Sequence, residues 1–283
     1  MIESTRFKLA VARTLHRVLR PVIGDAPRLV TRGGVRYELD PKEGIDLSIF
    51  VLGAFQRHVL REATRLLRRL PPGAVVFDVG ANIGSFALPV AHASPDARVH
   101  AFEPTAFAFA KLLRNLSLNP SLSGRIVPSR AFVAENDAAA VPDELYASWR
   151  VDGRSPDAHE VHGGTMQPTR GASVTSIDAV VSNAALSRLD LVKIDTDGSE
   201  LRVLRGGRTT LATLRPFVIF EIGLYELGPA FELFAEYDDL FKTLDYRLVA
   251  IPNGRPIQKD TFLREIPAQG TIDVLAIPPD RGI

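Results

Sequence analysis

Apolar positions change their spacing along this chain, and the alternation predicts a mostly parallel sheet covered by helices. Short apolar runs, typical of buried strands, alternate with stretches whose apolar residues recur at helical intervals. The expected strands begin at Val75 and Leu189 and also cover 97–104, 124–133, 215–222, 246–251 and 271–277. The expected helices cover 47–70, 105–118 and 229–244. The last two strands should pair near the Asn253-Gly254 turn.

The beginning of the chain is predicted to be a helical extension. The helix at 47–70 ends at Pro71-Pro72-Gly73, so residues 1–72 should form this extension and 73–283 the main domain. Residues 1–20 form an amphipathic basic helix with Arg6, Lys8, Arg13, Arg17 and Arg20 against Glu3. We expect this helix to cap its own domain or a homodimer partner, and peripheral membrane contact is the alternative.

The segment 136–172 interrupts the alternation. It has little apolar periodicity and contains Trp149, His159 and His162. Long segments of this kind are often lids or binding loops, so we expect it to cover an acceptor site; an insertion without function is the alternative. The two histidines are three residues apart, but no further ligands can be named, and no metal site is predicted there.

Composition narrows the class of protein. A chain of 283 residues with 46% hydrophobic content can form one large α/β domain. It has no cysteine, which excludes disulfides and thiolate chemistry and indicates a cytoplasmic setting. The net charge of +1 gives no general attraction to nucleic acid. No apolar run approaches the roughly 18–20 residues of a membrane span.

A glycine turn follows the first strand of this domain. The strand carries Asp78 and enters the turn Gly80-Ala81-Asn82-Ile83-Gly84. Glycines here permit positive φ and close packing of the next helix, and Asn tolerates positive φ. A dinucleotide fingerprint would have G-x-G-x-x-G. The spacing therefore favours S-adenosylmethionine over a nicotinamide cofactor.

The end of the second strand supports this cofactor. Glu103 closes the strand at 97–104, and an acid about 20 residues beyond the glycine turn commonly accepts hydrogen bonds from ribose hydroxyls. A solvated carboxylate at a strand end is the alternative. Together with the turn, Glu103 predicts a nucleotide-type cofactor site.

Four motifs resemble one family. DVGANIG, FEP, KIDTDGSELRVLRGG and RPFVIFEI occur in this order and at the spacing of the FkbM-type S-adenosylmethionine-dependent methyltransferases. The resemblance implies a class I methyltransferase fold, a Rossmann-like, doubly wound and mostly parallel seven-stranded sheet. It also implies O-methylation of a sugar or secondary metabolite, with the adenine near Ala131 and Phe132. The chain departs from the family's V-E-G at Thr196-Asp197-Gly198.

Carboxylates are expected to gather where the strands end. Asp195, Asp197 and Glu221 are the candidate bases, and Asp197 is the first of them, because a hydroxyl must lose its proton to accept a methyl group. Asp195 is also expected to contact the cofactor. The structural alternative for Asp197 is a helix N-cap that uses Glu200 in a capping box. Lys193 is predicted to neutralise these acids or to extend to the sheet edge.

Other functions remain in competition at this point. Three carboxylates could hold Mg²⁺, although no metal is expected. An RNA base methyltransferase shares the glycine turn but typically has an N/D-P-P-Y motif, which this chain lacks at 195–198. A non-catalytic cofactor-binding protein is the third class. The expected partner is a small-molecule or glycan acceptor.

Overall fold

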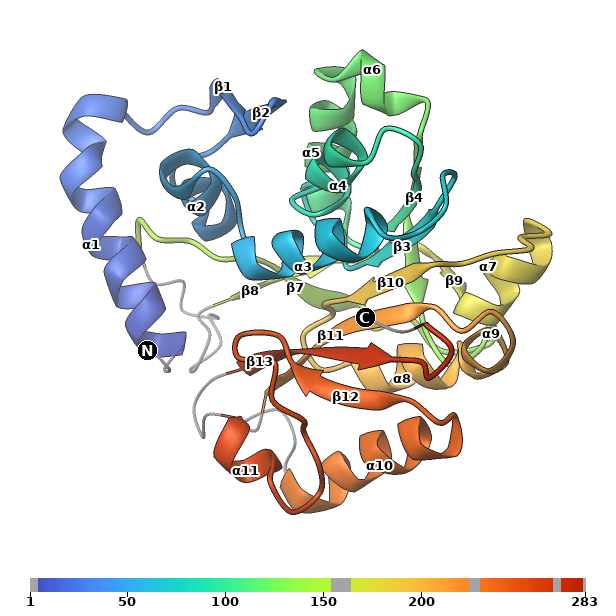
Figure 1. Ribbon diagram of the computed structural model, residues 1–283. Helices are drawn as coiled ribbons and strands as arrows, with labels where there is room; N and C mark the ends of the chain where they lie inside the picture. The colour runs from blue at the N-terminus through green and yellow to red at the C-terminus, as the bar shows by residue number, and fades with distance from the viewer. Residues whose placement is uncertain (1–4, 154–163, 224–229, 267–270, 282–283) are drawn as a thin grey trace.

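A seven-stranded sheet forms the centre of the computed structural model, which describes residues 5–153, 164–223, 230–266 and 271–281 (Figure 1). In spatial order its strands are β12 (Arg247–Ala250), β13 (Thr271–Ile277), β11 (Phe217–Gly223), β10 (Leu191–Ile194), β3 (Val75–Val79), β4 (Arg98–Phe102) and β5 (Ile126–Ser129). β13 is antiparallel to both of its neighbours, and the other pairs are parallel. This order confirms the class I methyltransferase fold.

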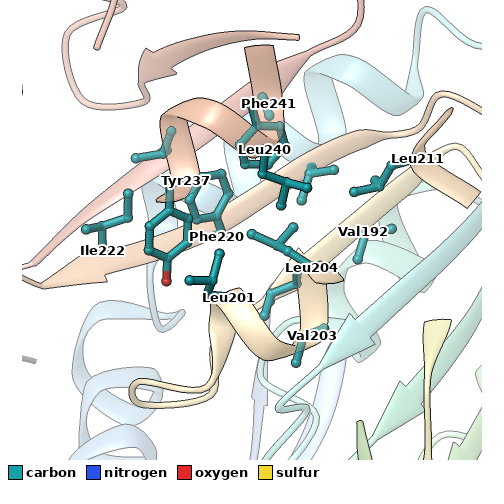
Figure 2. Close-up of a cluster of buried hydrophobic side chains, with 14 of the residues drawn as sticks. Val192, Leu201, Val203, Leu204, Leu211, Phe220, Ile222, Tyr237, Leu240 and Phe241 are labelled. Carbon is teal, nitrogen blue, oxygen red and sulfur yellow. The ribbon is translucent and has the colours of Figure 1, made fainter. Parts of the chain in front are cut away.

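Helices cover both faces of the sheet because its strands bury alternate residues on opposite sides. One face packs against α3 (Arg57–Leu67), α4 (Ala87–Ala93), α5 (Ala106–Ser117) and α6 (Pro120–Ser123). The other packs against α7 (Ile177–Asn183), α8 (Glu200–Arg205), α9 (Arg208–Thr213), α10 (Ala230–Thr243) and α11 (Phe262–Glu265). Figure 2 shows Phe220 of β11 beside Tyr237 of α10, with Leu201 of α8 in the same cluster.

The N-terminal part contains a hairpin that the pattern did not predict. It begins with α1 (Thr5–Ile23), continues through β1 (Arg28–Arg32) and β2 (Val35–Leu39), and then enters α2 (Gly44–Leu52). Gly33 and Gly34 form the two-residue turn with φ of 54° and 82°, as a type I′ hairpin requires. Asn115 and Asn119 of the region around α5 accept hydrogen bonds from the backbone of β2, at Glu38 and Arg36.

Two sequence predictions about element boundaries were wrong. The helix expected at 47–70 is divided into α2 and α3, because Gly53 closes α2 with a φ of 86°. The strand expected at 124–133 is also divided. β5 ends at Ser129, and β6 (Ala131–Val133) leaves the sheet to pair with β9 (Ser173–Thr175).

The segment at 136–172 has regular structure within its described residues. β7 (Glu144–Ser148) and β8 (Thr165–Pro168) form an antiparallel pair, which the lack of apolar periodicity did not predict. His159 and His162 lie outside the described residues. The pair is tied to the N-terminal part, because Gly44 donates its backbone N–H to the carbonyl of Trp149 and buried Glu43 accepts a hydrogen bond from Ser148. Across all described residues, no helix is long and apolar enough to span a bilayer.

Candidate cofactor and acceptor site

The turn after β3 has the conformation that its sequence predicts. Gly80, Asn82 and Gly84 have φ of 78°, 47° and 85°. A Cβ at Gly80 would lie 1.9 Å from the backbone oxygen of Asp195, so this glycine lets β3 and the end of β10 approach closely. A Cβ at Gly84 would lie 2.9 Å from a methyl group of Leu112, so Gly84 serves helix packing.

Glu103 lies at the end of β4 and fixes the same turn. Only 4% of it is exposed, and its carboxylate accepts the backbone N–H of Asn82 at 3.0 Å. Its other oxygen accepts the N–H and hydroxyl of Thr105 at 2.9 and 2.6 Å. Burial raises the pKa of Glu103, while these hydrogen bonds lower it. The side chain is therefore held in one position, and its oxygens retain further lone pairs.

Lys193 is a buried cation beneath the turn. Its Nζ donates to the carbonyl of Gly80 at 3.1 Å and lies 3.2 Å from Asp78 and 3.3 Å from Asp195. Burial alone lowers the pKa of Lys193, but the two carboxylates more than offset this and raise it. Burial raises the pKa of Asp78, and Lys193 opposes that rise. The structure thus confirms that Lys193 neutralises acids and does not extend to solvent.

The loop after β10 carries Asp195 and Asp197. Asp195 accepts a hydrogen bond from the side chain of Gln56 at 3.2 Å. Asp197 has a φ of 50°, and α8 begins later, with Ser199 at the N-cap. Glu200 accepts the backbone N–H groups of Thr196 and Gly198 at 2.7 and 3.0 Å. Asp197 is therefore not the N-cap of α8, although Glu200 does bond back to the loop.

A second group of polar side chains lies at the ends of β11 and β13. Glu221 accepts the hydroxyl of Thr271, and His58 of α3 pairs through Nε2 with the carboxylate of Asp273. Glu221 and Asp273 are directly opposite in the sheet. Burial, followed by the nearby carboxylates of Asp195 and Asp273, raises the pKa of Glu221 well above its usual value.

One cavity of about 1120 Å³ joins these groups. Eight of the predicted site residues line it: Gly80, Asn82, Glu103, Ala131, Phe132, Asp195, Asp197 and Glu221. Asp78 and Gly84 are not among the lining residues. Asp78 is fully buried and holds the turn from behind, through Lys193 and the backbone N–H of Ala87. The cavity thus brings together residues from strands far apart in the sequence.

Sequence reasoning missed the contribution of the N-terminal part to this cavity. Gln56 and His58 line it, as do Val11 and Leu15 of α1. The only local signal was the pair of polar residues at the start of an amphipathic helix, in F-Q-R-H. Within the described ranges, no three His, Asp or Glu side chains are arranged to hold a metal ion.

Comparison with known proteins gives a family match. Residues 78–248 match the family described as "Methyltransferase FkbM domain". This range begins at Asp78 on β3 and ends within β12. It includes every predicted site residue.

Three curated relatives have methyltransferase names. The chain is 31% identical over 222 residues to the 31-O-demethyl-FK506 methyltransferase FkbM of Streptomyces tacrolimicus, covering 64% of this chain and 81% of that protein. It is 29% identical over 204 residues to the 2-O-methyltransferase NoeI of Sinorhizobium fredii, covering 63% and 80%. It is 30% identical over 164 residues to the methyltransferase sdnD of Sordaria araneosa, covering 50% of this chain and only 62% of that protein.

Among solved structures, the methyltransferase FkbM from Methylobacillus flagellatus KT matches with a TM-score of 0.44 and 17% identity. The match covers 76% of this chain and 47% of that one.

Proposed function

The chain belongs to the FkbM methyltransferase family, and we propose that it transfers a methyl group from S-adenosylmethionine to a hydroxyl of a sugar or secondary metabolite. One observation carries the proposal. A single cavity connects the turn after β3 with the carboxylates at the ends of β10 and β11. A methyl donor and an acceptor can lie next to each other there, as an in-line displacement requires. We propose that 73–283 holds the cofactor and the carboxylates, and that the extension 1–72 completes the cavity.

The cofactor end of the cavity suits a nucleoside with a charged tail. Glu103 would accept hydrogen bonds from ribose hydroxyls, because its fixed carboxylate still has unused lone pairs. Ala131 and Phe132 offer apolar surface to an adenine ring. Gly80, Asn82 and Asp195 line the same cavity and are proposed to contact the rest of the cofactor. We propose that Asp78 and Gly84 act indirectly, by shaping the turn. When bound, S-adenosylmethionine supplies an electrophilic methyl carbon on a sulfonium.

The proton acceptor is proposed to be Asp197. An acceptor hydroxyl would have to compete with Lys193 and Gln56, which already contact the carboxylate of Asp195. The raised pKa of Glu221 favours its protonated form. Asp197 lies on the loop between β10 and α8 and lines the cavity.

A specific contact favours a second candidate. His58 lines the same cavity, and Asp273 holds its Nε2. A base oriented by a carboxylate is a common catalytic arrangement. His58 is therefore the proposed acceptor of the proton if Asp197→Asn retains its rate.

Calorimetry tests the cofactor assignment. The protein should bind S-adenosylmethionine and S-adenosylhomocysteine and should not bind NADH. Incubation with methyl-labelled S-adenosylmethionine and a panel of glycosides and hydroxylated metabolites then tests the reaction. Binding of NADH in place of S-adenosylmethionine would overturn the proposed cofactor. Label found on amine acceptors and absent from every hydroxyl acceptor would overturn O-methylation.

A further inference from the structure

The cavity has an apolar wall formed by the N-terminal helices. Val11 and Leu15 of α1 and Ile45, Val51 and Leu52 of α2 line it. These five residues, called the apolar wall below, come from helices that lie side by side (Figure 1). None of them belongs to the glycine turn, to Glu103 or to the matched family range.

The volume of the cavity indicates that more than a cofactor binds there. Pockets for small molecules usually measure roughly 300–1,000 Å³, and this one measures about 1120 Å³. Its cofactor end is formed by β3, β4 and β6, and the carboxylates lie at the ends of β10 and β11. The acceptor hydroxyl has to lie near those carboxylates. The wall is then available for the rest of the acceptor.

The wall exposes apolar side chains that nothing in the described chain covers fully. Val11 is 48% exposed, Val51 38% and Leu52 56%. Apolar side chains gathered around a cavity mark a binding surface more often than the same side chains scattered singly. A ligand that covers them gains binding free energy with each methylene buried.

A rim of polar side chains borders the cavity at another place. Asn253, Arg255, Arg264 and Glu265 line it. Asn253 donates to Glu265 at 3.0 Å, and Arg255 lies 3.6 Å from the same carboxylate. This rim offers hydrogen bonds to a hydroxylated group. The cavity therefore combines a polar rim and an apolar wall with the candidate bases.

We propose that the apolar wall is an acceptor subsite for an apolar arm several carbons long, so that the acceptor is an amphiphile with a hydroxylated head. This inference rests on the proposed function, because the cavity must hold an acceptor at all. Residues of α1 and α2 then determine specificity, while the sheet determines the reaction.

Alkyl glucosides test the subsite without knowledge of the natural acceptor. Butyl, hexyl and octyl β-D-glucoside share one head group, and calorimetry below their micelle concentrations measures the effect of the arm alone, with S-adenosylhomocysteine present. Affinity should rise by up to about fourfold per methylene and at least about tenfold across the series. Val11→Asp and Val51→Asp should reduce this rise to less than about twofold and leave S-adenosylhomocysteine affinity unchanged, because a carboxylate in an apolar contact is unfavourable.

Val22→Asp is the matched control. Val22 lies on α1 and is 81% exposed, but it does not line the cavity, so this variant should behave as wild type. Leu52→Asp replaces Val51→Asp if the latter unfolds. Equal affinity for butyl and octyl glucoside in the wild type would overturn the subsite, as would a Val22→Asp effect as large as that of Val11→Asp. Failure of S-adenosylhomocysteine to bind would instead contradict the proposed function. The dependence of glucoside affinity on chain length would still decide whether the apolar wall binds an alkyl arm.

Discussion

Replacing Gly80 with alanine tests how the turn after β3 is built. A Cβ there would lie 1.9 Å from the backbone oxygen of Asp195, and φ is 78°. The left-handed backbone costs an alanine roughly 1–2 kcal/mol. The collision adds about 1–3 kcal/mol, because a carbonyl at the end of a strand cannot turn aside as a flexible side chain can. We expect Gly80→Ala to lower the free energy of unfolding by about 2–5 kcal/mol.

Three other glycines separate these two causes. Gly198 has a φ of 102° and open space where the methyl group of an alanine would lie, so alanine there should cost only the roughly 1–2 kcal/mol of backbone strain. Gly206 has an ordinary φ of −73°, but its Cβ would lie 2.0 Å from the oxygen of Ala134, so only the collision of about 1–3 kcal/mol applies. Gly124 has a φ of −72° and open space, and alanine there should be neutral or stabilise by about 0.4–1 kcal/mol.

Urea unfolding of the four variants measures these costs, and calorimetry with S-adenosylhomocysteine measures the site. The loss at Gly80 should approximate the sum of the losses at Gly198 and Gly206. Affinity should fall in Gly80→Ala and stay unchanged in Gly124→Ala. A Gly80→Ala protein that is no less stable than Gly198→Ala would refute the argument from close approach of Asp195.

Three further changes test the site and its surroundings. Asp197→Asn should lower the methylation rate about 10²–10⁴-fold and spare S-adenosylhomocysteine affinity, the effect of removing a general base; an unchanged rate would move the base to His58. Glu103→Ala should weaken S-adenosylhomocysteine binding by about 1.5–3 kcal/mol in calorimetry, the range for hydrogen bonds to a charged group, and unchanged affinity in a folded variant would contradict the ribose assignment. Burial raises the pKa of Asp46 to about 6, against the opposing effect of Lys111. The folded state therefore favours protonated Asp46, and the free energy of unfolding of the wild type should fall relative to that of Asp46→Asn as pH rises from about 4 through 6. The same pH dependence in both proteins would contradict this.

Local sequence was sufficient to predict the turn after β3 and the place of Glu103 beside it. The apolar strand at Val75, the glycine spacing and Glu103 at the next strand end are all encoded within 29 residues, from Val75 to Glu103. Alternation of strands and helices leaves few topologies, because parallel strands need crossover helices. The mostly parallel seven-stranded sheet followed from that pattern together with the family resemblance, whereas the order of its strands came from the structure.

Boundaries were less predictable where short-range signals competed. The apolar periodicity of α2 and α3 is continuous in sequence, and the positive φ values of Gly53 and Gln56 separate the two helices. β5 and β6 were likewise predicted as one strand, but β6 pairs with β9, which begins more than 40 residues later. Strand pairing between distant segments cannot be inferred from the composition of one of them.

The sequence by itself determined most strands and helices around the central sheet and the turn after β3, because those depend on residues a few positions apart. The tertiary structure alone decided that His58 meets Asp273, that Gln56 meets Asp195, and that α1 lines the cavity. The two side-chain contacts join the N-terminal part to the sheet. His58 and Asp273 are 215 residues apart in the sequence, and Gln56 and Asp195 are 139 apart. A single polar side chain belongs to no sequence pattern from which its partner could be predicted. Its position is set by the packing of whole helices against the sheet.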